Sequence, residues 1–153
     1  HAQGRRFRSG DAWLLVGVCV LSLVYLSAGI TRRLNIYDEG LIVYGAERVL
    51  RGDIPYRDFW TVYSPGQFYT LAAIFKLVGP SILAARVWDT LVRALLAVSG
   101  FLLARRWMSR GLALFVWGLV LLWVGYYEFY GYPTFVALFL TLVCLLDCVL
   151  QVV

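Results

Sequence analysis

The sequence predicts an all-α membrane protein with about four transmembrane helices and one or two interfacial helices in the first outer loop. Of its 153 residues, 61% are hydrophobic, and the mean hydropathy is +0.76. A soluble domain of this composition would expose more apolar surface than water tolerates. The chain also contains about four apolar runs near the ~18 residues that cross ~30 Å of hydrocarbon as a helix. We expect residues 1–153 to form a single membrane domain.

The first apolar run, residues 12–30, contains no charged residue and follows a segment with three arginines. A run of this length can cross a membrane as a helix, and basic residues beside a span favour the cytoplasmic side. We therefore expect residues 1–11 to be a cytoplasmic tail and the first span to run outward.

Residues 31–80 are expected to form an outer loop with two short interfacial helices. Over residues 39–51, apolar side chains recur at three- and four-residue steps with charged side chains opposite, which is typical of an amphipathic helix. Asp38 stands at its N-cap position, and Gly52 stands where a glycine would end it. Residues 66–79 are apolar but too short to span and carry a lysine, so we place them at the outer interface.

Three longer runs are predicted to span the membrane: residues 81–104, 111–127 and 133–150. The first of them ends at a cluster of arginines, which should be cytoplasmic like the amino terminus. The second then leads outward and the third returns. Glycines repeat at seven-residue spacing along residues 111–127, which predicts close packing of a neighbouring helix on one stripe: Gly111, Gly118 and Gly125.

Charge, histidine and cysteine content exclude several function classes. The net charge of +5 could indicate nucleic-acid binding, but the arginines stand at helix ends rather than along one face, so we predict membrane lipids and no nucleic acid as partners. His1 is the single histidine, which argues against a histidine-based catalytic or zinc site. The cysteines fall inside apolar runs without metal-ligand spacing and read as small apolar residues: Cys19, Cys144 and Cys148.

The adjacent acids Asp38 and Glu39 are the first candidates for chemistry. Carboxylates at a membrane surface can act as a general base and as ligands for a divalent cation such as magnesium or manganese. The alternative is structural, with Asp38 capping a helix and Glu39 interacting favourably with its dipole in the first turn.

A second candidate site lies in the predicted span 81–104, where Arg86, Asp89 and Arg93 recur at three- and four-residue steps. Charge inside a membrane is costly unless it is paired or used. The two interpretations are a mutually satisfied Arg-Asp-Arg cluster and an anion site for a lipid-linked phosphate.

Aromatic residues surround the remaining candidates. Tyr63, with its aromatic neighbours in the outer loop, could stack on a sugar, although headgroup anchoring explains such residues without any ligand. Glu128 lies within an aromatic belt on the same predicted side as Asp38 and is a second possible substrate contact. The charged residues Asp53, Arg57 and Asp58 flank Pro55 and are expected to shape a turn through local hydrogen bonds.

Several segments occur in an order and at a spacing that resemble a known family: Tyr37-Asp38-Glu39-Gly40, residues 45–59, Tyr63-Ser64-Pro65-Gly66-Gln67-Phe68-Tyr69, residues 75–81, Ala84-Ala85-Arg86 and Leu103-Ala104-Arg105-Arg106. Over residues 12–140 the chain resembles the amino-terminal part of bacterial GT-C glycosyltransferases. The resemblance is to the branch related to protein O-mannosyltransferases and aminoarabinose transferases of lipid A.

The resemblance implies an inverting transfer of a sugar from a polyprenyl-phosphate donor to an acceptor on the outer face of the bacterial inner membrane. It assigns the base to Asp38, with Glu39 beside it, and a donor-phosphate contact to Arg86. Family members carry a further aspartate after a proline where the fourth span begins, whereas Pro133 is followed here by Thr134. We therefore expect either the amino-terminal module of such an enzyme or a non-catalytic scaffold or accessory subunit that contacts other membrane subunits.

Overall fold

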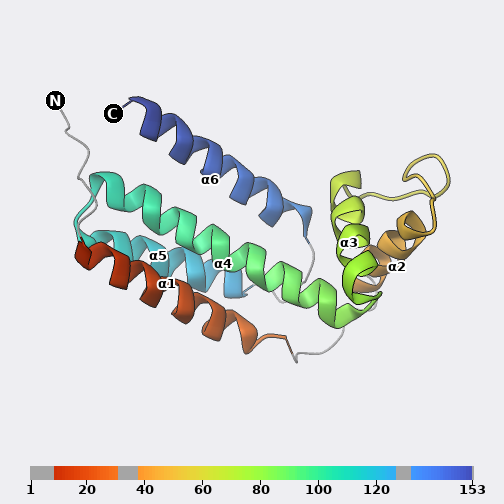
Figure 1. Ribbon diagram of the computed structural model, residues 1–153, viewed down its shortest axis with the longest axis horizontal. Helices are drawn as coiled ribbons and strands as arrows, with labels where there is room; N and C mark the ends of the chain where they lie inside the picture. Colours follow the sequence, from red (N-terminus) through yellow and green to blue (C-terminus); the bar gives the residue numbers. More distant parts are fainter. Residues whose placement is uncertain (1–8, 31–37, 127–131, 153) are drawn as a thin grey trace. The chain divides into compact units, whose positions relative to one another are not determined.

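The computed structural model describes residues 9–30, 38–126 and 132–152. These residues contain six helices and no strand (Figure 1): α1 (Ser9–Ser27), α2 (Asp38–Leu50), α3 (Pro65–Val78), α4 (Ile82–Trp107), α5 (Arg110–Tyr126) and α6 (Pro133–Val152). The prediction of an all-helical chain is confirmed. Each predicted helix is present, and its ends differ from the expected ones by at most a few residues.

Two of the helices are long and apolar enough to cross a membrane, namely α4 and residues 133–151 of α6. They indicate a membrane protein. Only 6% of the apolar window of α6 is buried inside the protein, against 61% for α4, so α6 presents its apolar surface outward. The apolar parts of α1 and α5 are 17 residues long each, and their crossing stays a prediction.

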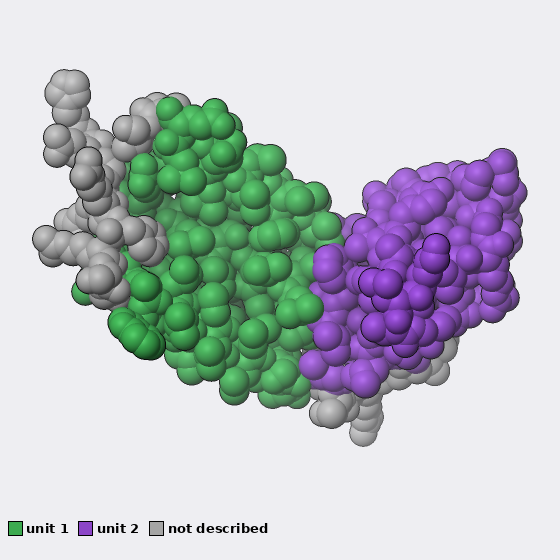
Figure 2. All heavy atoms as spheres, in the orientation of Figure 1, with its two compact units in different colours: residues 1–29, 90–127, 134–153 green, residues 30–89, 128–133 purple. Residues whose placement is uncertain are grey.

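The chain divides into two compact units, which Figure 2 colours separately. We call residues 1–29, 90–127 and 134–153 the bundle unit, and residues 30–89 and 128–133 the loop unit. The bundle unit contains α1, α5, most of α4 and nearly all of α6. The loop unit contains α2, α3 and the first turns of α4, and most of the candidate residues lie in it.

The bundle unit has an apolar core to which α1, α4 and α5 contribute: Val18, Val98, Phe101, Ala104 and Ala113. One polar contact crosses this core. The buried hydroxyl of Ser22 donates to the carbonyl of Val18 at 2.7 Å and accepts the indole N–H of Trp117 at 2.9 Å. A hydroxyl that both donates and accepts leaves no unsatisfied group in apolar surroundings.

Only one glycine of the predicted stripe on α5 permits close packing. A Cβ atom added to Gly125 would lie 2.5 Å from the Tyr25 ring, so a side chain at this position of α5 would force the ring of Tyr25 on α1 to move. Gly111 and Gly118 have open space where a Cβ would stand. The stripe prediction is therefore wrong at these two positions, because seven-residue spacing puts residues on one face without showing how far a neighbour follows that face.

A buried carboxylate joins the start of α1 to the end of α4. Asp11 is fully buried and accepts hydrogen bonds from Arg105 Nη2 at 3.2 Å and from Arg110 Nε at 2.9 Å. The sequence placed Asp11 in a cytoplasmic tail and treated both arginines as topology signals, and that description missed the ion pairs. The contact puts the amino end of α1 beside the carboxyl end of α4, as expected if those two ends share one side of a membrane.

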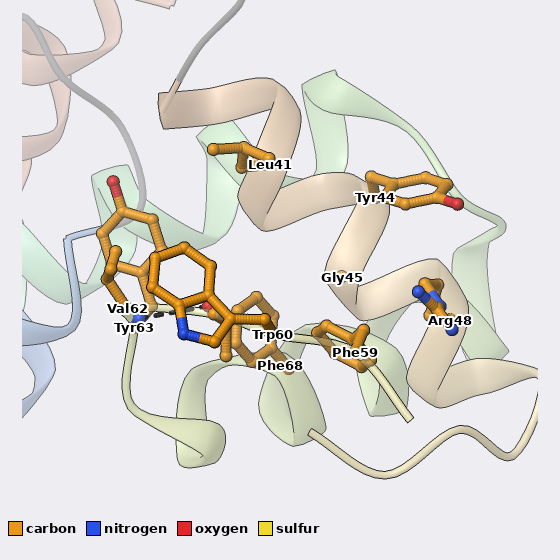
Figure 3. A pocket seen from close by; sticks show the side chains of 10 residues that line it. Leu41, Tyr44, Gly45, Arg48, Phe59, Trp60, Val62, Tyr63 and Phe68 are labelled. Carbon is orange, nitrogen blue, oxygen red and sulfur yellow. Dashed lines mark hydrogen bonds between the residues drawn. The ribbon is translucent and has the colours of Figure 1, made fainter. Parts of the chain in front are cut away.

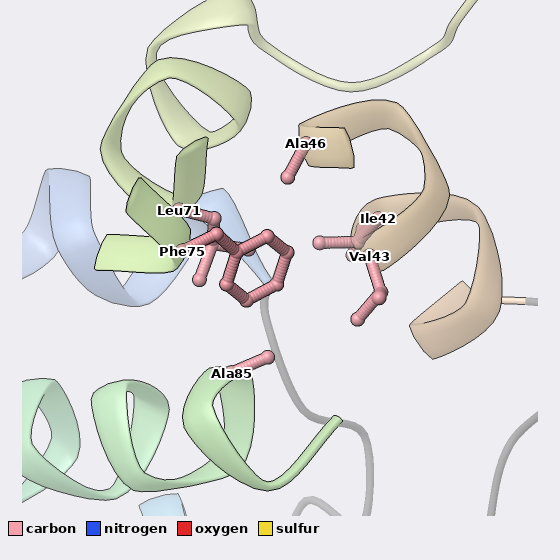
Figure 4. Close-up of a cluster of buried hydrophobic side chains, with 6 residues drawn as sticks. All are labelled: Ile42, Val43, Ala46, Leu71, Phe75 and Ala85. Atoms are coloured by element: carbon pink, nitrogen blue, oxygen red, sulfur yellow. The ribbon is translucent and has the colours of Figure 1, made fainter. Parts of the chain in front are cut away.

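The loop unit is held together by α2 and α3, which pack face to face. Figure 4 shows Leu71 and Phe75 of α3 pointing toward Ile42 and Val43 of α2. The buried cluster is completed by two small residues, Ala46 and Ala85. Gly45 allows the closest approach, because a Cβ there would lie 2.5 Å from a ring carbon of Phe68.

Hydrogen bonds end α2 as the sequence predicts. Gly52 has a positive φ of 105°, its N–H donates to the Val49 carbonyl at 3.0 Å, and the Asp53 N–H donates to the Arg48 carbonyl at 3.0 Å. This pair of bonds is the Schellman arrangement, which glycine adopts without steric cost. Helix α3 begins at Pro65, and at its carboxyl end the N–H of Gly79 donates to the Phe75 carbonyl.

Candidate functional site

Asp38 opens α2 and is bonded by a residue that follows the intervening loop. The Tyr63 hydroxyl donates to Asp38 Oδ1 at 2.5 Å. Burial, together with this bond to Asp38, raises the pKa of Tyr63 to about 12. Tyr63 therefore stays a protonated donor at physiological pH and fixes the orientation of the half-buried carboxylate.

Glu39 and Arg86 form a buried ion pair between α2 and α4. Arg86 Nε and Nη2 donate to the two oxygens of Glu39 at 2.5 and 2.8 Å, and Arg86 Nη1 donates to the Ile30 carbonyl at 2.6 Å. Glu39 is 2% exposed and Arg86 is 6% exposed. A bidentate pair in such surroundings is strong and specific in geometry, so it anchors the first turn of α2 to α4.

The same contacts bear on the predicted cation site. Both oxygens of Glu39 accept from Arg86, and one oxygen of Asp38 accepts from Tyr63. Within residues 9–30, 38–126 and 132–152, no three side chains of the ligand-forming types gather as a metal site. A divalent cation normally requires several oxygen ligands, and Glu39 in this arrangement does not fit as one.

The loop between α2 and α3 is fixed by its own charged residues, as predicted. Asp58 accepts from the Ile54 N–H at 2.8 Å and from Arg57 Nη2 at 2.8 Å, while Arg48 Nε donates to Asp53 at 2.6 Å. The hydrogen bond from Arg57 and then that from the Ile54 N–H lower the pKa of Asp58 to about 2. The loop is thus held by charge-assisted bonds across the physiological pH range.

Tyr56 links this loop to Tyr63, the residue that binds Asp38. Its φ is +67°, in the left-handed region that side chains rarely adopt, and its N–H donates to the Phe59 carbonyl at 2.9 Å. The Tyr56 hydroxyl donates to the Tyr63 carbonyl at 2.7 Å. The strained residue therefore holds the backbone of Tyr63, whose side chain in turn holds Asp38.

A cavity of about 260 Å³ lies beside Tyr63, between α2, α3 and the loop. In Figure 3, Leu41, Tyr44 and Arg48 project from α2, and Phe68 projects from α3. The lining residues are mostly aromatic or aliphatic: Leu41, Tyr44, Gly45, Arg48, Phe59, Trp60, Thr61, Val62, Tyr63 and Phe68. Tyr63 belongs to both features, since it lines the cavity and its hydroxyl binds Asp38.

The structure thus brings four of the predicted site residues into the loop unit as two bonded pairs, Asp38 with Tyr63 and Glu39 with Arg86. Arg93 belongs to the bundle unit. Its Nη1 donates to the Val124 carbonyl at 2.8 Å, and its guanidinium lies 4.5 Å from the centre of the Phe135 ring. It thereby ties α4 to α5 and α6.

Glu128 lies outside the described residues, so its predicted role stays a prediction. The sequence also missed Tyr44 and Arg48 as lining residues of the cavity. The available signal was their spacing, because Leu41, Tyr44 and Arg48 lie three and four residues apart and so share one face of α2.

The chain matches no protein-family model, no curated protein and no solved structure.

Proposed function

We propose that the chain is the amino-terminal module of an integral membrane glycosyltransferase that moves a sugar from a polyprenyl-phosphate donor to an acceptor on the outer face. The observation that carries this proposal is the oriented carboxylate of Asp38. It is partly exposed, it is fixed by Tyr63 at 2.5 Å, and its neighbour Glu39 is anchored to Arg86. A general base needs this combination of a set direction and access to substrate.

In the proposed reaction, Asp38 accepts the proton of the acceptor hydroxyl. The acceptor oxygen forms a bond to the anomeric carbon of the sugar, and the bond from that carbon to the phosphate oxygen breaks. Its electron pair leaves with the polyprenyl phosphate, and attack from the opposite face inverts the anomeric configuration. Asp38 returns its proton to water at the end of the cycle.

The leaving phosphate requires a cation, and Arg86 is the proposed contact. Its guanidinium donates to Glu39 and Ile30. We propose that a donor phosphate replaces one of these acceptors, since a guanidinium binds phosphate and carboxylate with the same bidentate geometry. Glu39 is then a positioning residue that keeps Arg86 in place before the donor binds.

A transfer assay in proteoliposomes with the full chain tests this proposal. Native chain should move a radiolabelled sugar from a polyprenyl-phosphate donor to a product that chromatography separates from the donor, and Asp38→Asn should lose at least about 10²-fold of that rate. Glu47→Gln is the matched control, because Glu47 is an acid on the same helix and its ion pair is with the exposed Arg51. Equal rates for native chain and Asp38→Asn would remove the base from the mechanism.

The second candidate function is a non-catalytic membrane subunit. The outward apolar surface of α6 favours it, because such a surface can pack against helices of other subunits as well as against lipid. Purification in a mild detergent distinguishes the two functions. Stable association with other membrane proteins, together with no transfer by the resulting complex, would establish the subunit and refute the enzyme.

A further inference from the structure

The cavity beside Tyr63 is electrically neutral although an arginine lines it. Arg48 Nε binds Asp53 at 2.6 Å, its Nη2 binds the Asp58 carbonyl at 2.9 Å, and its guanidinium lies 4.8 Å from the centre of the Phe59 ring. A cation engaged with a carboxylate, a carbonyl and an aromatic face has little remaining attraction for an anion. The chemistry of the cavity is therefore unlike that of a phosphate site.

Two polar side chains of the lining are also engaged in hydrogen bonds. Thr61 Oγ1 accepts the Tyr63 N–H at 3.1 Å, and the Tyr63 hydroxyl donates to Asp38. The other polar groups of the aromatic lining, the Tyr44 hydroxyl and the Trp60 indole N–H, belong to exposed rim residues, so a sugar ring inside the cavity would meet few partners, and each hydroxyl left without one costs about 1–3 kcal/mol. The lining therefore favours an apolar occupant over a sugar, in contrast to the stacking role considered for these aromatic residues from the sequence.

The rim of the cavity is apolar as well. Leu41, Tyr44, Trp60 and Val62 are 58%, 57%, 83% and 68% exposed. An exposed cluster of large apolar side chains marks a surface that meets lipid or a partner. In a chain whose helices α4 and α6 are suited to a membrane, this rim favours a ligand that arrives from the bilayer.

The size of the cavity suits one segment of hydrocarbon. A dry cavity of ~150 Å³ lined by apolar residues takes up benzene. At about 260 Å³, this cavity is larger but remains too small for two packed chains. The floor is rigid, because Phe68 is held against Gly45 with no room for a Cβ between them.

We propose that the cavity binds one aliphatic chain, acyl or isoprenoid, of a membrane lipid, and that this lipid is the sugar acceptor. The assignment as acceptor rests on the function proposed above, whereas the binding of the chain does not. Tyr63 connects the cavity with Asp38. A lipid chain held against Tyr63 brings the hydroxyl of that lipid toward the Asp38 carboxylate, which the Tyr63 hydroxyl orients. The acceptor is then an amphiphile with its hydroxyl close to an aliphatic chain.

Photolabelling of the full chain in nanodiscs tests the binding directly. The probes are hexadecanol and farnesol, each bearing a diazirine on the chain, and labelled peptides are identified by mass spectrometry. We expect labels on residues 41–48 and 59–68, and competition by unlabelled alcohol of the same type should remove them. The probe that labels at the lower concentration identifies the chain as acyl or isoprenoid.

Matched variants place the site in the cavity. Val62→Trp places a larger side chain in the cavity from an exposed lining position and should lower labelling about tenfold. A tenfold loss corresponds to the lost burial of about two methylene groups of the lipid chain. Leu77→Trp makes the same kind of change at an exposed α3 residue away from the cavity and should label like native chain. Competition on native chain needs no variant to fold, so it tests the proposal independently.

Three outcomes separate the two proposals. Equal labelling of native chain and Val62→Trp, or labels that competition does not remove, would overturn the cavity assignment. Labelling that persists in Asp38→Asn while sugar transfer to the alcohol is lost supports both proposals. Competed labelling of native chain without any transfer supports the lipid-chain site and refutes the assignment of that lipid as acceptor.

Discussion

Replacing Glu39 by glutamine should release α2 from α4. The exchange keeps the shape of the side chain but removes the carboxylate charge that Arg86 binds, in a site where the side chains of Glu39 and Arg86 are only 3% and 8% exposed. Removing one partner of a buried pair costs about 3–5 kcal/mol. Total stability of small domains is about 5–15 kcal/mol, so this change takes a large share of it.

Hydrogen exchange measured by mass spectrometry is the appropriate assay, because it reports local opening of α2 in detergent or nanodiscs. In the regime where exchange follows the opening equilibrium, a loss of about 3–5 kcal/mol speeds exchange of the residue 38–50 amides roughly 10²- to 10⁴-fold. Glu47→Gln is the control. Its pair with Arg51 is exposed and is worth about 0.3–0.5 kcal/mol, so it should change exchange by no more than a few-fold.

The result that would refute this reasoning is equal exchange of α2 in Glu39→Gln and Glu47→Gln. It would mean that the buried pair contributes no more than the exposed one. A second test is the double variant Glu39→Leu with Arg86→Met, which removes both charges from the site. It should recover much of the loss, since apolar replacement of a complete buried pair is often neutral or stabilising.

Further predictions follow from single contacts. Gly45→Ala should lower the free energy of unfolding of the loop unit by about 1–3 kcal/mol, because the added methyl group overlaps Phe68. Gly40 lies on the same helix with open space around it, so Gly40→Ala should raise that free energy by up to about 1 kcal/mol. Thermal unfolding of both variants checks this, and equal midpoints would contradict it. The raised pKa of Tyr63 means that the folded state holds this proton more tightly than the unfolded state does. The resulting stability is complete below pH 10 and is lost as the pH rises toward 12, so Tyr63→Phe should abolish that part of the alkaline loss in thermal midpoint, and Tyr69→Phe should retain it. Asp11→Asn should destabilise the bundle unit by about 3–5 kcal/mol, because the buried carboxylate that Arg105 binds is lost. Hydrogen exchange of the α1 amides measures this. Protection equal to that of native chain would show that the ion pairs contribute nothing.

Local sequence signals predicted the elements of this fold well. Helix ends at Gly52 and Pro65 followed from backbone chemistry that acts within a few residues, and the hydrogen bonds of Asp58 follow from the same short range. The apolar runs gave the helices but not their membrane crossing, because length and composition are shared by buried and spanning helices.

Contacts between residues far apart in the sequence could not be predicted from local patterns. Glu39 and Arg86 are 47 positions apart, and each looked suited to a substrate because nothing local marked the other as its partner. Tyr63 was proposed as a sugar contact, yet its hydroxyl meets Asp38 across 25 positions. The cavity was missed for the same reason, since its walls come from two helices and a loop that only tertiary packing brings together.

The ion pairs of Asp11 also constrain the order in which the chain can assemble. A ribosome makes Asp11 first, and Arg105 and Arg110 follow 94 and 99 residues later. Until then these two ion pairs cannot form. The contact between the start of α1 and the end of α4 is therefore completed only after α4 has been translated, so this part of the bundle unit depends on pairing across the sequence and not on local folding.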